Sequence, residues 1–225
     1  MPYYAPLTQG NDALMLWLNL DPDYRTTSGT TTDWKNFMKP SEIFGNTNAA
    51  RHPTDNGTHI TFADDFLTCN VDRDLDTSGG GWTIYTRYKE DDWSDNSAIA
   101  GDDDTNNMFI KNVGDGFSVK TYNGSADETK GLSFDTPSAL VDDTYYNLAV
   151  TCTVGGLLTA YIDGVAQVDT ETLTDDTYNM MYSEVGGKNG ASWILNGSVQ
   201  EVIVWHNCLS ALQITDVNTY LNNKF

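Results

Sequence analysis

The sequence predicts an all-β protein: a two-sheet antiparallel jelly-roll β-sandwich with a short C-terminal helix. Composition is the first reason, because 225 residues include 26 Asp against 6 Glu, with 28 Thr, 20 Asn and 19 Gly. Asp, Asn and Gly favour turns, and Thr favours strands. At least nine segments carry strand patterns, and no helical pattern alternates with them, which excludes parallel βαβ units.

The strands follow from hydrophobic patterning and turn residues. Residues 13–20 form a short apolar run that ends at Asp21-Pro22, as expected for a strand buried on both faces. In residues 82–89 the side chains alternate, so Trp82, Ile84, Thr86 and Tyr88 face away from Thr83, Tyr85 and Arg87. The full set of predicted strands is 13–20, 58–63, 66–71, 82–89, 108–112, 116–122, 145–154, 157–162, 165–168 and 198–205.

Capping signals predict one helix, which follows the last strand. Ser210 is the N-cap and Gln213 completes an S-x-x-Q capping box, while Leu209 and Ile214 form a hydrophobic staple. Ile214, Val217 and Leu221 then fall on one face. The helix therefore caps the sandwich.

Three long polar segments are predicted to be loops. Residues 21–57 are polar and Thr-rich, with one short helical turn expected near Trp34–Phe37. Residues 72–81 are rich in Asp and Gly, and residues 90–107 form the most acidic segment. We expect the segment 90–107 to lie at the surface, because an unpaired buried carboxylate costs several kcal/mol, on the order of 3 or more.

Four segments in order resemble the concanavalin A-like lectin/glucanase superfamily in its laminin-G-like form. Residues 145–164 are similar to a family hairpin that ends in Tyr-Val-Asp-Gly, and residues 197–210 resemble the family's closing strand. Residues 81–88 and, more weakly, 14–21 resemble two further strands. The resemblance implies one domain over 13–225, preceded by an arm of residues 1–12. This fold hosts lectins, glycan hydrolases, adhesion modules and viral structural proteins.

Net charge excludes two classes of partner. The chain carries a formal charge of −20 and has a pI near 4.1. Such a surface repels phosphate backbones and anionic membranes, so we expect neither nucleic acid nor membrane as a partner. Divalent cation binding and a simple solvated acidic surface remain as alternatives. No run approaches the roughly 18 apolar residues of a membrane span, and no basic-apolar leader opens the chain.

The glutamates argue against catalysis. Glycanases of the resembled superfamily carry a Glu-x-Asp-x-Glu strand motif, whose alternate carboxylates flank the scissile bond. No two of Glu42, Glu90, Glu128, Glu171, Glu184 and Glu201 lie close enough to form it. We therefore expect no enzyme; an unrecognised Asp pair is the alternative.

Two acidic clusters are candidate Ca²⁺ sites, because Ca²⁺ takes six to eight hard oxygen ligands. Solvated loops are the competing interpretation of both. The clusters are Asp91, Asp92, Asp95, Asp102, Asp103 and Asp104 in one segment, and Asp72, Asp74 and Asp76 in the other.

Three tryptophans are candidate contacts for a glycan or a partner, because an exposed aromatic ring can stack on a sugar. Trp93 is the best candidate, since it lies within the acidic segment, and Trp34 and Trp193 follow. The competing interpretation makes each a loop anchor packed on the core.

Cysteine usage and acidity bear on where the protein is made and which particle or surface it belongs to. Cys69, Cys152 and Cys208 are odd in number and show no paired spacing, so we expect three free thiols. The features together favour a non-catalytic, lectin-like phage virion component, a capsid decoration or tail protein. It would contact other virion proteins or copies of itself, and host-surface glycans. The alternatives are a secreted or cell-surface carbohydrate-binding module and, with less support, a glycoside hydrolase.

Overall fold

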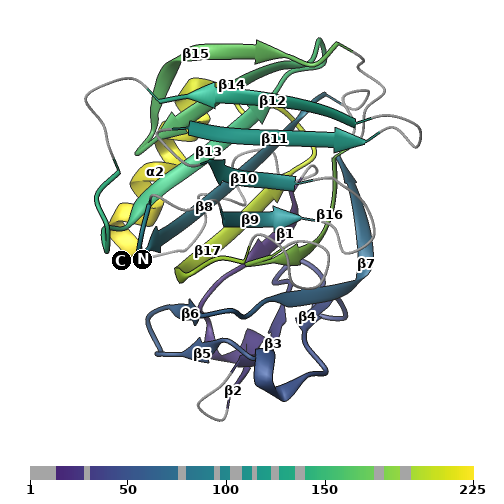
Figure 1. The fold of residues 1–225 in the computed structure, drawn as a ribbon, viewed down its shortest axis with the longest axis vertical. Helices are drawn as coiled ribbons and strands as arrows, with labels where there is room; N and C mark the ends of the chain where they lie inside the picture. Colours follow the sequence, from purple (N-terminus) through teal and green to yellow (C-terminus); the bar gives the residue numbers. More distant parts are fainter. Residues whose placement is uncertain are drawn as a thin grey trace.

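The computed structural model describes residues 14–27, 31–75, 80–93, 97–101, 108–112, 116–122, 127–134, 140–174, 180–187 and 194–225. It confirms the predicted class. Two antiparallel sheets pack face to face, and one α-helix follows the last strand (Figure 1). The expected arm, residues 1–12, lies outside the described residues.

Sheet A has eight strands, with β8 and β17 at its centre. One of the eight, β1 (Leu14–Leu18), lies off the main strand order and pairs with β17 on the same side as β6. In spatial order the others are β15 (Val165–Thr172), β14 (Leu157–Ile162), β13 (Tyr146–Cys152), β8 (Trp82–Glu90), β17 (Gly197–Trp205), β6 (Ile60–Phe62) and β5 (Thr54–Asp55).

Sheet B has nine strands and covers one face of sheet A. In spatial order they are β12 (Asp127–Ser133), β11 (Gly116–Tyr122), β10 (Met108–Asn112), β9 (Ser97–Gly101), β16 (Met180–Val185), β7 (Leu67–Leu75), β4 (Ile43–Gly45), β3 (Thr31–Lys35) and β2 (Arg25–Thr27).

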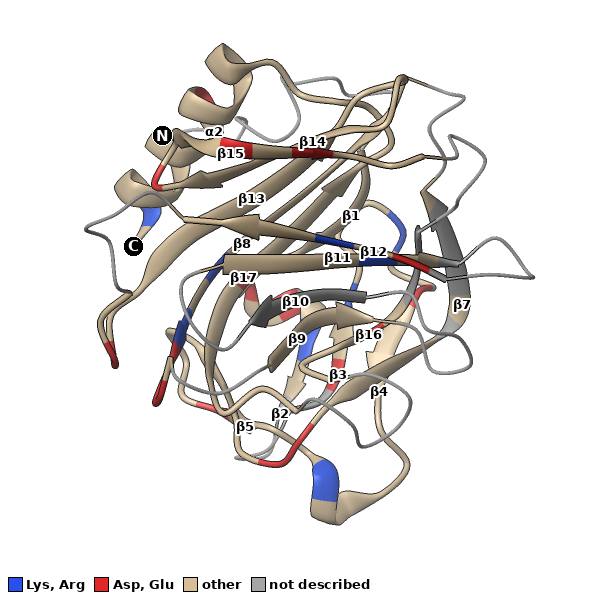
Figure 2. Cartoon of the chain, turned by 45° about the horizontal axis from the view of Figure 1, so that its top comes forward, with Lys and Arg blue, Asp and Glu red and all other residues tan. Residues whose placement is uncertain are grey.

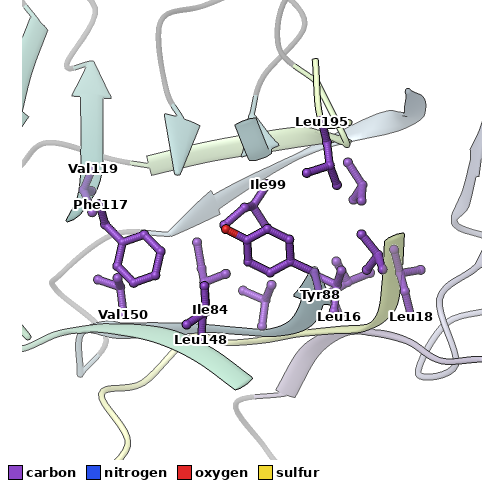
Figure 3. Packing of buried hydrophobic residues seen from close by; sticks show 14 of the residues in the cluster. Leu16, Leu18, Ile84, Tyr88, Ile99, Phe117, Val119, Leu148, Val150 and Leu195 are labelled. Atoms are coloured by element: carbon purple, nitrogen blue, oxygen red, sulfur yellow. The ribbon is translucent and has the colours of Figure 1, made fainter. Parts of the chain in front are cut away.

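The main core lies between the sheets. Ile84, Leu148 and Val150 of sheet A meet Ile99 and Phe117 of sheet B, and all five are fully buried (Figure 3). Alternate residues of each strand face this core, which is why strand patterning was visible in the sequence.

A second, smaller core lies on the outer face of sheet A, under helix α2 (Ala211–Lys224). Ile214, Val217 and Leu221 are fully buried against outward side chains that include Tyr85 and Ile203. The predicted capping box of Ser210 and Gln213 is present.

The polar segment 21–57 was wrongly predicted to be a loop. It contains β2, β3, β4 and β5, with 3₁₀ turns at η2 (Pro22–Tyr24) and η3 (Ala49–Arg51). The helical turn expected near residues 34–37 is absent, because Trp34 and Lys35 belong to β3. These strands have only two to five residues, which is too short for an alternating pattern to stand out.

Two further loop predictions are corrected in part. Strand β7 continues to Leu75, so Asp72 and Asp74 lie in a strand. Within 90–107, β8 includes Glu90, and β9 is buried along its whole length. Strand β9 was missed in the sequence because it consists mostly of small residues and lies between acidic segments, yet it is an inner strand of sheet B. Strands β12 and β16 were not predicted.

Candidate binding surface at the end of the C-terminal helix

Strand β8 places two cations on the outer face of sheet A. Tyr88 and Glu90 point into the sandwich and are 0% and 1% exposed. Arg87 and Lys89 alternate with them and therefore face outward, where both are partly exposed. The predicted alternation of residues 82–89 is confirmed.

A bulge in β17 turns two neighbouring polar residues toward the same face. The β17–β8 register shifts between Val199 and Glu201, which leaves Gln200 as the extra residue. Gln200 accepts a hydrogen bond from Arg87 Nε, with 2.7 Å between nitrogen and oxygen. Glu201 lies beneath the end of α2.

Glu201 anchors that helix end. Its fully buried carboxylate accepts hydrogen bonds from Lys224 Nζ at 2.6 Å, from the Tyr220 hydroxyl at 3.1 Å and from the Trp17 indole nitrogen. Burial raises the pKa of Glu201, and Lys224 opposes this shift most strongly. The ion pair holds Lys224 at a defined position beside Arg87's strand.

Arg87 is held by neutral partners. Besides the bond to Gln200, Nη1 donates to Asn147 Oδ1 at 2.9 Å and to Asn222 Oδ1 at 3.4 Å. Burial lowers the pKa of Arg87, and the more distant Asp163 opposes this shift. Three amide oxygens thus fix the guanidinium without neutralising it.

Cations and aromatic rings alternate across this surface, which we call the cation–aromatic row. Arg87 Cζ lies 5.7 Å from the Tyr145 ring centroid and 5.8 Å from that of Phe225. Lys89 Nζ lies 5.9 Å from the Tyr145 centroid, within cation–π range. Lys224 Nζ lies 5.1 Å and 5.4 Å from the centroids of Phe225 and Tyr220. In order, the row is Lys89, Tyr145, Arg87, Phe225, Lys224 and Tyr220.

Basic residues are few in this acidic chain, and the row concentrates three of its 12 Lys and Arg residues. Figure 2 marks basic residues on β8 and at the end of α2. Two of the three are paired with acids: Lys89 Nζ lies 2.6 Å from Asp143 Oδ1, and Lys224 holds Glu201.

His59 borders the row from the start of β6. Its ring centroid lies 6.3 Å from that of Tyr145. Burial, followed by the charge of Lys89, lowers the pKa of His59. Burial raises the pKa of Tyr145. Both rings therefore favour their neutral forms at this surface.

The structure corrects two of the tryptophan predictions. Trp34 is fully buried and donates from its indole nitrogen to the Asn19 carbonyl oxygen at 2.7 Å. Trp93 is 5% exposed, donates to the Val141 carbonyl oxygen at 2.9 Å, and packs on Tyr88 and Tyr146. Neither ring presents a face to a sugar, so both are core anchors. Trp193 lies outside the described residues.

The Ca²⁺ candidates are not brought together in the described part of the chain. Asp91 and Asp92 are exposed, and Asp72 and Asp74 lie in β7. No group of three or more potential metal ligands occurs among the residues that the structure describes. The other candidates, Asp76, Asp95, Asp102, Asp103 and Asp104, fall outside those residues, so Ca²⁺ binding stays a prediction.

The row itself was missed in the sequence. Arg87-x-Lys89 on one strand face was a usable signal, because cations are rare in this chain. The contribution of Tyr145, His59 and Phe225 could not be inferred, because each comes from a different part of the chain.

The comparisons identify the family. A sequence model described as the concanavalin A-like lectin/glucanases superfamily, Laminin_G_3, matches residues 54–215. The chain therefore belongs to this superfamily. No curated protein sequence matches the chain. In the described residues, no helix is long and apolar enough to cross a membrane.

Solved structures share the fold at low sequence identity. The Trypanosoma rangeli sialidase matches with a TM-score of 0.61 and 11% identity, over 94% of this chain and 33% of that chain. The binding domain of botulinum neurotoxin DC, in complex with rat synaptotagmin II, matches with a TM-score of 0.58 and 13% identity. That match covers 94% of this chain and 52% of the other. A structure of botulinum neurotoxin type C, whose cell entry depends on interaction with two ganglioside molecules, matches with a TM-score of 0.58 and 15% identity, over 96% of this chain and 53% of that chain. The chain thus spans between a third and about half of these proteins.

Proposed function

We propose that this protein is a non-catalytic, lectin-like binding domain that binds saccharides at the cation–aromatic row. The row is the observation that carries the proposal. It combines aromatic rings, fixed hydrogen-bond donors and amide groups on one surface of a lectin-type fold. Membership of a lectin and glucanase superfamily supports the proposal. Two structural neighbours also support it: one is a sialidase, and the other is a neurotoxin whose cell entry depends on gangliosides.

The row has the two kinds of group that bind sugars. Phe225 is 40% exposed and offers an apolar ring to the C–H face of a pyranose. Exposed Asn222 and partly exposed Arg87 offer polar groups to hydroxyls around that ring. Because Arg87 is already held by amide oxygens, little side-chain entropy is lost when a ligand binds it.

A glycan array followed by calorimetry tests the proposal. We expect at least one class of saccharide to bind, and Phe225→Ala to weaken its binding about tenfold, since aromatic contacts contribute on the order of 1 kcal/mol or more. Leu212→Ala is the matched control, because Leu212 is an exposed apolar residue in the first turn of the same helix. Absence of binding to every glycan, or equal losses in both variants, would contradict the proposal.

The absence of catalysis is a further part of the proposal. Glu42, Glu90, Glu184 and Glu201 are at most 2% exposed, which keeps them from flanking a bound glycosidic linkage, and the two partly exposed glutamates, Glu128 and Glu171, both pair with Lys130. We expect no reducing ends from laminarin, agarose, carrageenan or lichenan, and no free sialic acid from sialyllactose. Product release that is lost when an Asp pair is changed to Asn would overturn this.

The place where the protein acts, a phage particle or a cell surface, stays a prediction. We propose a phage virion component that contacts host-surface glycans; the alternative is a secreted or cell-surface carbohydrate-binding module. Mass spectrometry of purified phage particles would detect the chain in the first case. Recovery only from particle-free supernatant or from cell surfaces would favour the second. Saccharide binding at the row does not depend on which is correct.

A further inference from the structure

Arg87 differs from the other two cations of the row in its partners. Lys89 is paired with Asp143, and Lys224 is paired with Glu201. Arg87 forms no ion pair with any of the described residues, and its three hydrogen-bond acceptors are the neutral amides of Gln200, Asn147 and Asn222. A partly buried guanidinium normally has an anionic partner, because burial of an unpaired charge is unfavourable.

The hydrogen bonds of Arg87 are also incomplete. A guanidinium carries five N–H donors, of which one is on Nε and two are on each terminal nitrogen. Nε and Nη1 are used by the three amides, while Nη2 has no partner within the described residues. Nη2 is also not among the buried atoms that lack a partner, so solvent reaches it. The two donors on Nη2 are therefore open to solvent and available to a ligand.

The exposed ring of Phe225 lies next to this guanidinium, 5.8 Å from its centre. A ligand that contacts both groups needs an apolar face beside an anionic oxygen pair. A pyranose that carries a carboxylate or a sulfate group has this combination, since carboxylate and sulfate oxygens match the guanidinium fork.

The charge of the whole protein limits the size of such a ligand. A formal charge of −20 repels polyanions at distances up to about 10 Å at moderate salt, the Debye length. One acidic sugar with neutral neighbours fits a single unpaired arginine, whereas a densely sulfated polymer does not.

We propose that the saccharide bound at the row is acidic: a single carboxylated or sulfated sugar whose anionic group pairs with Arg87 and whose ring contacts Phe225. This inference rests on the proposed function, because it specifies the ligand class of the same surface. It assigns Arg87 to selectivity for charge and Phe225 to binding of the sugar ring.

The test compares four probes with one lactose core: 3′-sialyllactose, its methyl ester, 3′-sulfated lactose and lactose. We expect an acidic probe to bind at least tenfold more tightly than both neutral ones, and the carboxylated and sulfated probes distinguish the two sources of anion. Arg87→Gln should weaken the acidic probe about 10- to 100-fold, the size expected for losing charge-assisted hydrogen bonds. For lactose and the methyl ester the loss should be smaller, about fivefold or less, because only neutral hydrogen bonds to hydroxyls are lost, whereas Phe225→Ala should weaken all four probes.

Arg51→Gln is the matched control, since Arg51 lies in η3, remote in sequence from the row, and is partly exposed as Arg87 is. Arg87→Lys keeps the charge without the fork and carries the test if Arg87→Gln unfolds; we expect an intermediate loss. Binding of both acidic probes no tighter than that of lactose and the methyl ester, binding of neutral array glycans alone, or equal competition by a hexaglutamate peptide would overturn the acidic-sugar inference and leave saccharide binding intact. No binding to any glycan would overturn both.

Discussion

At the scale of single residues, the ion pair of Glu201 and Lys224 fixes the end of α2 and thereby positions part of the proposed binding surface. The carboxylate is fully buried, and the lysine side chain is 14% exposed. Glu201 lies next to the β17 bulge, and its bond to Lys224 keeps the end of α2 close to Arg87. A buried pair contributes modestly when complete, but removal of one partner leaves an unpaired charge.

Lys224→Met should therefore destabilise the protein by about 3 kcal/mol at pH 7. The pKa of Glu201 is already raised by burial, and loss of the lysine raises it further. Because the folded state then binds a proton more tightly than the unfolded state does, the variant should regain stability as pH falls from 7 toward 4. Urea unfolding at several pH values measures this.

Lys89→Met serves as the comparison, because the Asp143 side chain with which Lys89 pairs is 71% exposed and stays solvated when the lysine is removed. We expect less than about 1 kcal/mol for that change. A pH-independent loss in Lys224→Met would show that lost packing, and not the unpaired carboxylate, causes the effect.

Cysteine chemistry gives a second residue-scale prediction. None of Cys69, Cys152 and Cys208 forms a disulfide in the structure, and burial raises the pKa of the Cys152 thiol to about 12. Since the thiolate is the reactive form, Cys152 should resist alkylation at pH 8 in the native protein. Thiol titration of denatured, unreduced protein should count three groups; a count of one would reveal a disulfide.

At the scale of elements, the entry to β8 depends on a glycine. Gly81 has φ of +84°, and a Cβ there would lie 2.0 Å from the Cys152 carbonyl oxygen. The chain therefore needs glycine both for its backbone conformation and for its close approach to β13. This contact sets where β8 begins, and through alternation it sets which face carries Arg87.

Gly81→Ala and Gly57→Ala separate these two effects. Gly57 has φ of +80° with nothing within 4 Å of the added Cβ, so that change should cost only about 1 kcal/mol of backbone strain. Gly81→Ala should cost several kcal/mol, about 3 or more, because backbone atoms must move. Thermal melts of both variants test this, and equal losses would contradict the steric argument.

At the scale of the whole molecule, two contacts join the sheets at opposite ends. Arg25 Nη1 lies 2.6 Å from both oxygens of Asp55 and links β2 of sheet B to β5 of sheet A. Glu128 of β12 accepts from the Thr174 backbone nitrogen at 2.9 Å and 3.0 Å, beside β15. Local pairing of this kind holds the sandwich closed against the repulsion of a −20 charge.

Because that repulsion is screened by salt, stability should rise with ionic strength. We expect a gain of about 1–2 kcal/mol between roughly 0.02 M and 0.5 M NaCl, seen as a higher melting temperature. KCl should act equally, since screening does not depend on the cation. A flat or falling melting temperature would contradict this.

CaCl₂ at matched ionic strength extends the measurement to the predicted Ca²⁺ clusters. A rise beyond that in NaCl, abolished when Asp102, Asp103 and Asp104 are changed to Asn, would support a bound ion. An equal rise would mean that the acidic segment is only solvated.

Local sequence patterns predicted the fold class, most of the longer strands and the terminal helix. Alternation in residues 82–89, the Asp163-Gly164 turn and the Ser210 cap are local signals, and each was confirmed because neighbouring residues generate it. The short strands β2 to β5 lacked such a signal, since sheet pairing and not local pattern makes them strands.

The place of the proposed binding surface follows from tertiary packing and not from any local sequence pattern. Trp93 stood out in the sequence as an aromatic residue among acids, yet packing against Tyr88 and Tyr146 buries it. Arg87, Tyr145 and Phe225 gave no joint signal, because they lie far apart along the chain: pairing of β13 with β8 brings Tyr145 to Arg87, and docking of α2 brings Phe225. Burial and proximity are properties of the packed chain, so no local pattern could assign them.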